Sequence, residues 1–373
     1  MDFAFGEDHE VLRHSSRRFL GDRQSLSTLR PQLEDPEIFD RVGWREAAAL
    51  GWTSMLIPGG YDGGSITDQP IIDLIVLAEE LGRVLHPGPF VPTNVVADAI
   101  ATWGTELQRR ELLANIAQGE LLAAWCMSGD GSIEGSECGV EATSRAGTFV
   151  LNGVARFVHG ATVAGELLVL ARCRSSLVHL IVPASTPGVA VRTQKTIDLT
   201  RRFGEVVFDG AAVSTARLID ADAEGVRGRA INLATVLQAA EAVGAADLLL
   251  HETVDYLKVR MQFGRTIGSF QAIKHRLADL LILLEGMRAA TYYGALALND
   301  GFEDVDAAVS TAGSFVGDGF STLCGEALQL HGGIGFTWEH DVHLFLRRAI
   351  ANKGLYGDPS WHRERLCAAA EAA

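Results

Sequence analysis

Apolar residues recur every three to four positions in the first part of the chain and again in its last part, which is the period of an amphipathic helix. Within residues 1–120 the pattern predicts several helices, among them Ile71 to Leu85 and Glu106 to Ala117. From about residue 224 onward it predicts long helices over 225–260, 268–297, 304–331 and 338–356.

Between these helical parts the apolar residues alternate or form short runs. Gly, Ser, Asp and Pro separate the runs, as is typical of an antiparallel barrel or sandwich and not of βαβ units. The predicted strands are Leu121–Met127, Thr148–Leu151, Ala155–His159, Leu167–Arg172, Val178–Pro183, Val189–Arg192, Gly204–Phe208 and Ala212–Arg217. The sequence therefore predicts an α+β protein with an N-terminal helical domain (1–120), a middle β domain (121–223) and a C-terminal helical bundle (224–373).

Composition narrows the classes of partner. The chain has 373 residues, with 32 basic and 47 acidic groups and a net charge of −15, so we expect no nucleic-acid partner. Its five cysteines are odd in number and lack C-x-x-C spacing, which indicates reduced thiols in the cytoplasm and no zinc or other metal site. The most apolar stretch, Ile231 to Leu250, contains Glu241 and Asp247, so we expect no membrane span. The N-terminus, MDFAFGEDHE, carries acidic residues before any apolar run, so we expect no signal peptide.

One stretch stands out chemically. Residues 257–284, LKVRMQFGRTIGSFQAIKHRLADLLILL, predict the end of one helix, a turn at Gly264 and Gly268, and a second helix that doubles back. The turn carries Arg260, Gln262 and Phe263, the first two of which can donate hydrogen bonds to phosphate or carbonyl oxygens. A solvated turn explains these residues equally well when they are taken alone.

This stretch resembles a known family. From Arg260 onward, RMQFGRTIGSFQAIKHRLADL is similar to the R-x-x-F-G-x-x-I/L-x-x-x-Q-x-x-x-x-x-L-A-x-x segment of the acyl-CoA dehydrogenases. Residues 326–349, EALQLHGGIGFTWEHDVHLFLRRA, resemble the family's Q-x-x-G-G-x-G-F stretch. The resemblance implies a helical domain, a β domain and a C-terminal four-helix bundle. It also implies an oxidoreductase in which a carboxylate removes the α proton of an acyl-CoA thioester and FAD accepts hydride from the β carbon.

The resemblance implies two sets of FAD contacts. The flavin ring would lie against Met127 and Ser128 at one strand end and Phe157 on the next strand. At His159 the family usually has Thr or Ser; a solvated histidine at the strand end is favoured over a flavin contact. The rest of the nucleotide would be held by a neighbouring subunit's Arg260, Gln262, Phe263, Gln271, Gln329, Gly332 and Gly333.

The catalytic base is where this chain departs from the family. Of the two positions that carry the family's Glu, one is Tyr356 here and the other is Ala234. Two carboxylates could substitute. Asp358 lies two residues after Tyr356, but it is also placed to cap a helix that begins at Pro359. Glu241 lies two turns beyond Ala234 among apolar neighbours, where a raised pKa is expected, unless another helix or subunit supplies a partner for it.

Two functions remain open. The chain is either a non-catalytic subunit that lends FAD contacts to a catalytic sister, as in paired subunits of bacterial steroid side-chain degradation, or a self-sufficient dehydrogenase with a displaced base. Both imply an acyl-CoA substrate, a homo- or hetero-oligomer arranged as a dimer of dimers, and an electron-transfer flavoprotein as acceptor. If the fold is right, Gly82 to Thr93 and the face of 231–245 should line the acyl tunnel.

Overall fold

The computed structural model describes residues 6–35, 39–127 and 138–372. Its N-terminal part is helical, because apolar residues at helical spacing bury one or more faces of each segment. The helices of this part are α1 (Glu7–Arg23), α2 (Leu26–Leu29), α3 (Arg41–Ala48), α4 (Pro70–Arg83), α5 (Phe90–Trp103) and α6 (Glu106–Ala117). They pack around the fully buried side chains of Trp52, Leu74 and Phe90.

The middle part is one eight-stranded sheet in the order β6-β7-β3-β2-β4-β5-β8, with β1 paired to β4. Its pairs are antiparallel except β1 with β4 and β2 with β4, which are parallel. The strands are β1 (Ala123–Cys126), β2 (Val140–Arg145), β3 (Thr148–His159), β4 (Glu166–Cys173), β5 (Ser176–Pro183), β6 (Val189–Gln194), β7 (Phe203–Ser214) and β8 (Leu218–Ile219).

The sheet corrects three strand predictions. β3 is one strand of twelve residues where the pattern predicts two, because the register shift at Leu151 and Asn152 does not end its ladder with β7. The pattern likewise predicts two strands, Gly204–Phe208 and Ala212–Arg217, where β7 is one strand of twelve residues. β2 was missed, since Val140 and Ala142 are its only buried side chains.

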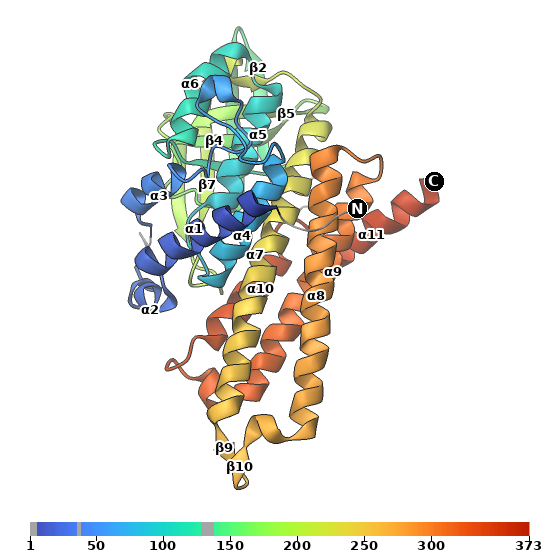
Figure 1. Ribbon diagram of the computed structural model, residues 1–373. Helices are drawn as coiled ribbons and strands as arrows, with labels where there is room; N and C mark the ends of the chain where they lie inside the picture. The colour runs from blue at the N-terminus through green and yellow to red at the C-terminus, as the bar shows by residue number, and fades with distance from the viewer. Residues whose placement is uncertain (1–5, 36–38, 128–137, 373) are drawn as a thin grey trace.

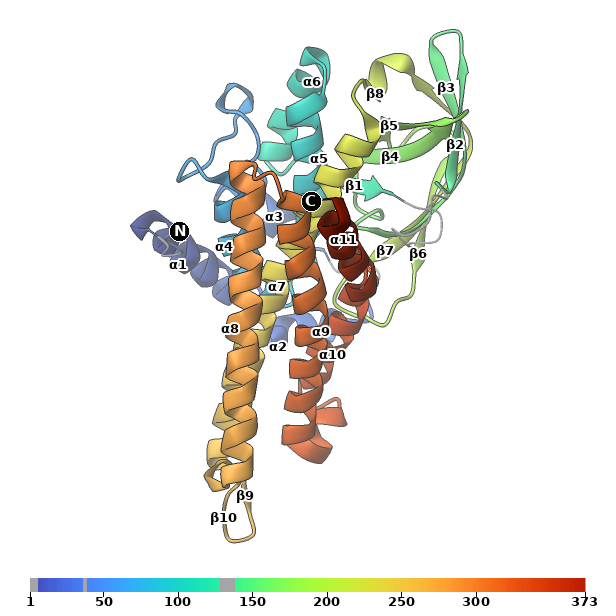
Figure 2. The same cartoon turned by 90° about the vertical axis from the view of Figure 1, so that its right-hand side faces the viewer.

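The C-terminal part consists of long helices that run away from the sheet (Figures 1 and 2). They are α7 (Ala223–Val259), α8 (Gln271–Asp300), α9 (Val305–His331), α10 (Val342–Lys353) and α11 (Pro359–Ala372). A short hairpin of β9 (Met261–Gln262) and β10 (Arg265–Thr266) joins α7 to α8 at the far end of the bundle. The predicted α+β fold is confirmed.

The long helix α7 is the core of this arrangement. Among the described residues it alone is long and apolar enough for a membrane span, but 83% of its most apolar window is buried inside the protein. Its apolar character is therefore explained by packing, since a helix that is hydrophobic on all sides is typical of a protein core.

Helices α4 and α7 touch backbone to backbone. A Cβ atom added to Gly82 would lie 1.8 Å from the carbonyl oxygen of Glu241, and one added to Gly244 would lie 1.8 Å from that of Glu79. The two glycines therefore allow an approach that no larger residue permits. Their surfaces are used by this helix contact, so the expectation that they line an acyl tunnel is wrong for Gly82 and Gly244.

Several histidines are buried in the interior, where water cannot solvate a charged imidazolium. Burial, helped by Arg348 and Arg201, lowers the pKa of His86 to about 3. Burial also lowers the pKa of His179 and of His362 to about 4 each. These imidazoles are neutral in the folded protein well below the pH at which they protonate in an unfolded chain.

This set of histidines predicts loss of stability in mild acid. Between about pH 6.5 and pH 4 the unfolded chain binds protons that the folded chain does not, so the free energy of unfolding falls as the pH falls. Each histidine contributes a slope of up to about 1.4 kcal/mol per pH unit. Urea unfolding at steps from pH 7.5 to pH 5 measures the slope. His179→Leu should flatten it, and an unchanged slope in that variant would contradict this account.

Candidate cofactor site and catalytic positions

The turn between α7 and α8 projects into solvent at the tip of the bundle (Figure 1). The side chain of Phe263 is 92% exposed, and its backbone has a φ of 50°, in the left-handed region. Gln262 is also exposed, and the Arg260 guanidinium has no hydrogen-bond or ion-pair partner among the described residues. An exposed phenyl ring beside a free guanidinium is a surface suited to a partner and a phosphate group.

The other residues predicted to hold the FAD nucleotide lie at the same end of the bundle. Tyr256, in the last turns of α7, stacks on His331 at the end of α9 with ring centres 4.6 Å apart. The next two residues, Gly332 and Gly333, are exposed, and a Cβ atom at either would meet nothing within 4 Å. Their backbone is therefore open to close approach by a ligand. Gln329 and Gln271 are exposed as well, on the last turn of α9 and the first residue of α8.

The predicted flavin-facing residues lie elsewhere, on the sheet. Met127 follows β1 and is partly buried. Phe157 lies in the β3 bulge with a φ of 52°; its ring is 42% exposed and its N–H donates to Gln194 Oε1 at 2.7 Å. Ser128 lies outside the described residues. The structure thus separates the predicted FAD contacts into two groups, one on the sheet and one at the far tip of the bundle (Figure 2).

His159 is buried, not solvated. Only 5% of it is exposed, and its ring lies 5.4 Å from that of Phe203. Burial, together with Arg201 and Arg348, holds its pKa well below the ordinary value. The expectation of a solvated histidine at a strand end is therefore wrong. The strand pattern did not predict this, because the residues that enclose His159 come from other parts of the chain.

Neither family base position can accept a proton near neutral pH. Tyr356 is 5% exposed and stacks on Trp125, with ring centres 6.2 Å apart and planes 12° from parallel. Its burial raises the pKa of the phenol above the ordinary value, so the hydroxyl remains protonated. Ala234 is fully buried in the core. The rings of Tyr356 and Trp125 therefore pack together at the position that the sequence resemblance assigns to the catalytic carboxylate.

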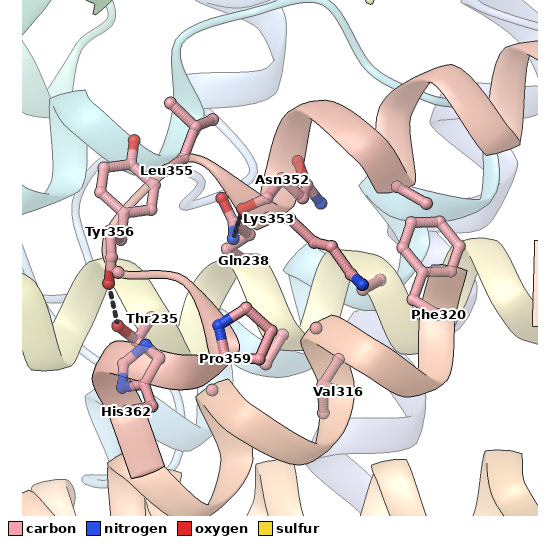
Figure 3. Close-up of a pocket in the computed structure, with 16 residues that line it drawn as sticks. Thr235, Gln238, Val316, Phe320, Asn352, Lys353, Leu355, Tyr356, Pro359 and His362 are labelled. Atoms are coloured by element: carbon pink, nitrogen blue, oxygen red, sulfur yellow. Dashed lines mark hydrogen bonds between the residues drawn. The ribbon is translucent and has the colours of Figure 1, made fainter. Parts of the chain in front are cut away.

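The cavity that adjoins this position is small. Figure 3 shows the Tyr356 carbonyl meeting the Thr235 hydroxyl, a hydrogen bond of 3.4 Å, above a space bordered by Gln238, Asn352 and His362. Its volume is about 20 Å³, which holds about one water molecule and no acyl chain.

Glu241 has a buried partner, which a loop of the same chain supplies and not another helix or subunit. Its buried carboxylate forms an ion pair with Arg201, whose guanidinium also donates to Asn352 Oδ1 at 2.9 Å. A carboxylate paired with a buried guanidinium is not free to take a proton from a substrate. Sequence reasoning missed Arg201, because it lies in the loop before β7 and only the folded chain brings it to α7.

Asp358 serves as a helix cap. Its Oδ1 accepts a hydrogen bond from the Trp361 N–H at 2.8 Å, which satisfies one of the free donors at the start of α11. The interpretation of Asp358 as an N-cap before Pro359 is confirmed.

Asp358→Ala should therefore lower the free energy of unfolding by about 1 kcal/mol, as expected for the loss of an N-cap. Asp358→Asn keeps the cap and serves as the matched control, with stability close to wild type. Thermal unfolding followed by circular dichroism measures both. A loss of several kcal/mol in the alanine variant, shared by the asparagine variant, would point to a role of the charge beyond capping.

Comparison with known proteins agrees with this geometry. Residues 6–120 match the acyl-CoA dehydrogenase N-terminal domain, and residues 226–370 match the acyl-CoA dehydrogenase C-terminal domain. Acyl-CoA dehydrogenase IpdE2 of Mycobacterium tuberculosis is 30% identical over 366 residues, covering 96% of each chain. Its namesake in Mycolicibacterium smegmatis is 29% identical over 361 residues, covering 96% of this chain and 98% of the relative.

Solved structures of similar fold support the same family assignment. A variant of the steroid ACAD Tcur3481-Tcur3483 has a TM-score of 0.87 at 28% identity over 99% of both chains. The ChsE4-ChsE5 complex from Mycobacterium tuberculosis has a TM-score of 0.89 at 25% identity over 100% of both. The chain belongs to the acyl-CoA dehydrogenase family, whose members are oxidoreductases acting on CH–CH bonds, with FAD as cofactor.

The exposed tip fits the nucleotide part of FAD. A free guanidinium at Arg260 can meet a phosphate, an aromatic face at Phe263 can meet an aromatic ring, and Gly332 and Gly333 offer open backbone. The tip points away from the sheet that carries the predicted flavin contacts (Figure 2). Among the described residues no group of three or more His, Cys, Asp and Glu could hold a metal ion.

Proposed function

We propose that this chain is a subunit of a heteromeric acyl-CoA dehydrogenase and lends the Arg260–Phe263 turn to the FAD of a catalytic partner chain. The observation that carries the proposal is the pair of Tyr356 and Trp125, which pack together at the position of the family's base. FAD, when bound, accepts the hydride in the reaction of this family. The partner chain supplies the carboxylate that removes the α proton.

The state of the two substitute carboxylates supports this division of labour. Glu241 is committed to Arg201 and Asp358 to the start of α11, so neither is free to take a proton from a thioester. The base must be partly desolvated and not paired with a cation to work near neutral pH. The exposed tip retains all of its expected FAD-binding groups, as a supporting subunit requires.

The names of the relatives suggest the substrate class. The steroid ACAD and the two-chain ChsE4-ChsE5 complex point to an acyl-CoA with a steroid-derived acyl group and to a partner encoded as a second family member. We further propose a cytoplasmic assembly of two such heterodimers, with an electron-transfer flavoprotein as acceptor. We also propose that the chain divides into an N-terminal helical domain (1–120), a middle β domain (121–223) and a C-terminal helical bundle (224–373).

The test is to purify the chain alone and together with its partner, and to record flavin absorbance. We expect a colourless protein alone and a yellow complex whose flavin bleaches with the acyl-CoA. The Arg260→Ala variant should reduce flavin content of the complex at least about tenfold, since charge-assisted hydrogen bonds to phosphate contribute about 1.5–3 kcal/mol. Arg145→Ala, an exposed arginine of the sheet, is the matched control and should behave like wild type.

The alternative is a self-sufficient dehydrogenase that uses Glu241. It requires bound flavin in the isolated chain, bleaching by an acyl-CoA, and loss of that bleaching in Glu241→Gln. That set of results would refute the heteromeric proposal.

A further inference from the structure

The last turns of α7 and the end of α9 are in contact at the tip of the bundle, and each helix leads into one exposed turn. α7 leads into the turn that begins at Arg260, and α9 leads into Gly332 and Gly333. The proposed function assigns both turns to the nucleotide of one FAD. Two turns bind one ligand at a smaller entropic cost when their separation is fixed before the ligand arrives.

Tyr256 is bonded to both of these turns. Its carbonyl oxygen accepts a hydrogen bond from the Arg260 N–H at 2.9 Å, where α7 ends. Its hydroxyl donates to the His331 carbonyl oxygen at 3.3 Å, one residue before Gly332. The last carbonyl oxygens of a helix lack an intrahelical N–H partner, so this hydroxyl satisfies one of them at the end of α9. One residue therefore connects the segment with the free guanidinium to the segment with the open glycines.

Ring packing strengthens the connection between α7 and α9. The stacked rings of Tyr256 and His331 have planes 20° apart, and the ring of His340 lies 4.5 Å from that of His331. The His331 Nδ1–H donates to the Ala327 carbonyl oxygen at 2.8 Å, which fixes the imidazole on α9. Burial lowers the pKa of both histidines below the ordinary value, so the stacked rings are uncharged near neutral pH. The cluster is therefore held without charge.

The glycines that follow His331 depend on this support. Gly332 has a φ of 66° and a ψ of −143°, a conformation that glycine adopts readily and other residues do not. Neither Gly332 nor Gly333 has a side chain that could pack on the rest of the protein, and glycine loses more freedom on ordering than any other residue. The contacts of His331 therefore decide where this turn lies.

We propose that Tyr256 is a positioning residue for the FAD nucleotide, and that it sets the separation between the Arg260–Phe263 turn and the Gly332–Gly333 turn. This inference rests on the proposed function and names the side chain that organises the lent site. Tyr256 is not itself one of the predicted FAD contacts. Its replacement therefore weakens FAD binding by loosening the two turns, with every predicted contact residue still present.

The test adds FAD to the flavin-free complex of this chain with its partner and follows the change in flavin fluorescence. Tyr256→Leu removes the stacked ring and the hydroxyl, and should weaken FAD binding at least about tenfold. Tyr256→Phe keeps the ring and should weaken binding about fivefold, the effect of one neutral hydrogen bond.

Tyr293→Leu is the matched control. Tyr293 is also half-buried and its ring also meets another aromatic ring, that of Phe302 at 6.5 Å. It lies on α8, 22 residues beyond the helix start at Gln271, and so about 33 Å along the helix from the tip. Tyr293→Leu should bind FAD like wild type.

Hydrogen exchange in the isolated chain gives a readout that needs neither FAD nor the partner. The amides of residues 329–337 should exchange faster in Tyr256→Leu than in wild type, because the turn loses the contacts that hold it. They should exchange at the wild-type rate in Tyr293→Leu. An unchanged rate in Tyr256→Leu would show that the turn does not depend on Tyr256, and would overturn the inference.

The FAD titration separates this inference from the proposed function. Undiminished binding by a folded Tyr256→Leu, with binding weakened in Arg260→Ala, would overturn the role of Tyr256 and leave the proposed function standing. Unchanged binding in Arg260→Ala would refute the lent turn, and this inference with it. An equal loss in Tyr293→Leu would show that any change in bundle packing has the same effect, which also overturns the role of Tyr256. If Tyr256→Leu does not fold, wild-type affinity in Tyr256→Phe overturns the hydroxyl bond between the two helices.

Discussion

Replacing Gly244 by alanine is expected to destabilise the protein strongly, because the added methyl group would meet helix backbone. The added Cβ would lie 1.8 Å from the Glu79 carbonyl oxygen, which belongs to helix backbone and cannot rotate away. Helices α4 and α7 would have to separate along a contact that also holds Gly82 against Glu241. We expect a loss of about 3 kcal/mol or more, at or above the upper range for overpacked cores.

Soluble yield and urea unfolding measure this effect. Gly228→Ala is the matched control, because Gly228 lies on the same helix and a Cβ there meets nothing within 4 Å. That variant should be unchanged or up to about 1 kcal/mol more stable, as expected for alanine in a helix. Equal stability of the two variants would show that the backbone contact is less tight than described.

Arg348→Met is expected to have the second largest effect. Arg348 is 2% exposed and donates to Asp198 Oδ2 at 2.5 Å, to Thr200 Oγ1 at 2.5 Å and to the carbonyl oxygens of Leu85 and His86. Methionine fills much of the volume but leaves the fully buried Asp198 carboxylate without its cation. We expect a loss of about 3–5 kcal/mol, because one charge of a buried pair remains uncompensated.

The double variant Arg348→Met, Asp198→Asn removes both charges and should recover part of the loss. Arg110→Met is an exposed comparison: its pair with Glu106 lies on the surface, so the change should be below about 1 kcal/mol. Chemical unfolding of wild type, Arg348→Met, Asp198→Asn and the double variant gives the coupling energy between Arg348 and Asp198. A coupling near zero would contradict a strong buried pair.

The fold was predictable from the sequence because its signals are local. Helical periodicity located α6 at Glu106–Ala117 without error and α9 to within one residue of Val305–His331. Strands were harder, since β3 continues through a bulge and β2 buries only two side chains. Motifs identified the family, and the comparisons confirm it.

The site was predictable only in part, because its decisive contacts are long-range. Nothing near Glu241 in sequence shows that Arg201 will meet it, and nothing near His159 shows that Phe203 will cover it. The helix cap at Asp358 was found since capping depends on residues a few positions away.

The 37 residues of α7 set the distance between the core of the protein and the exposed tip of the bundle. A helix of that length spans about 55 Å, and each added residue would advance the tip by about 1.5 Å and turn it by about 100°. One insertion between Ala234 and Arg260 would turn the segment that carries the Arg260 guanidinium by about 100° relative to the core. The length of this segment therefore decides where the tip lies, whereas the composition of its exposed face does not.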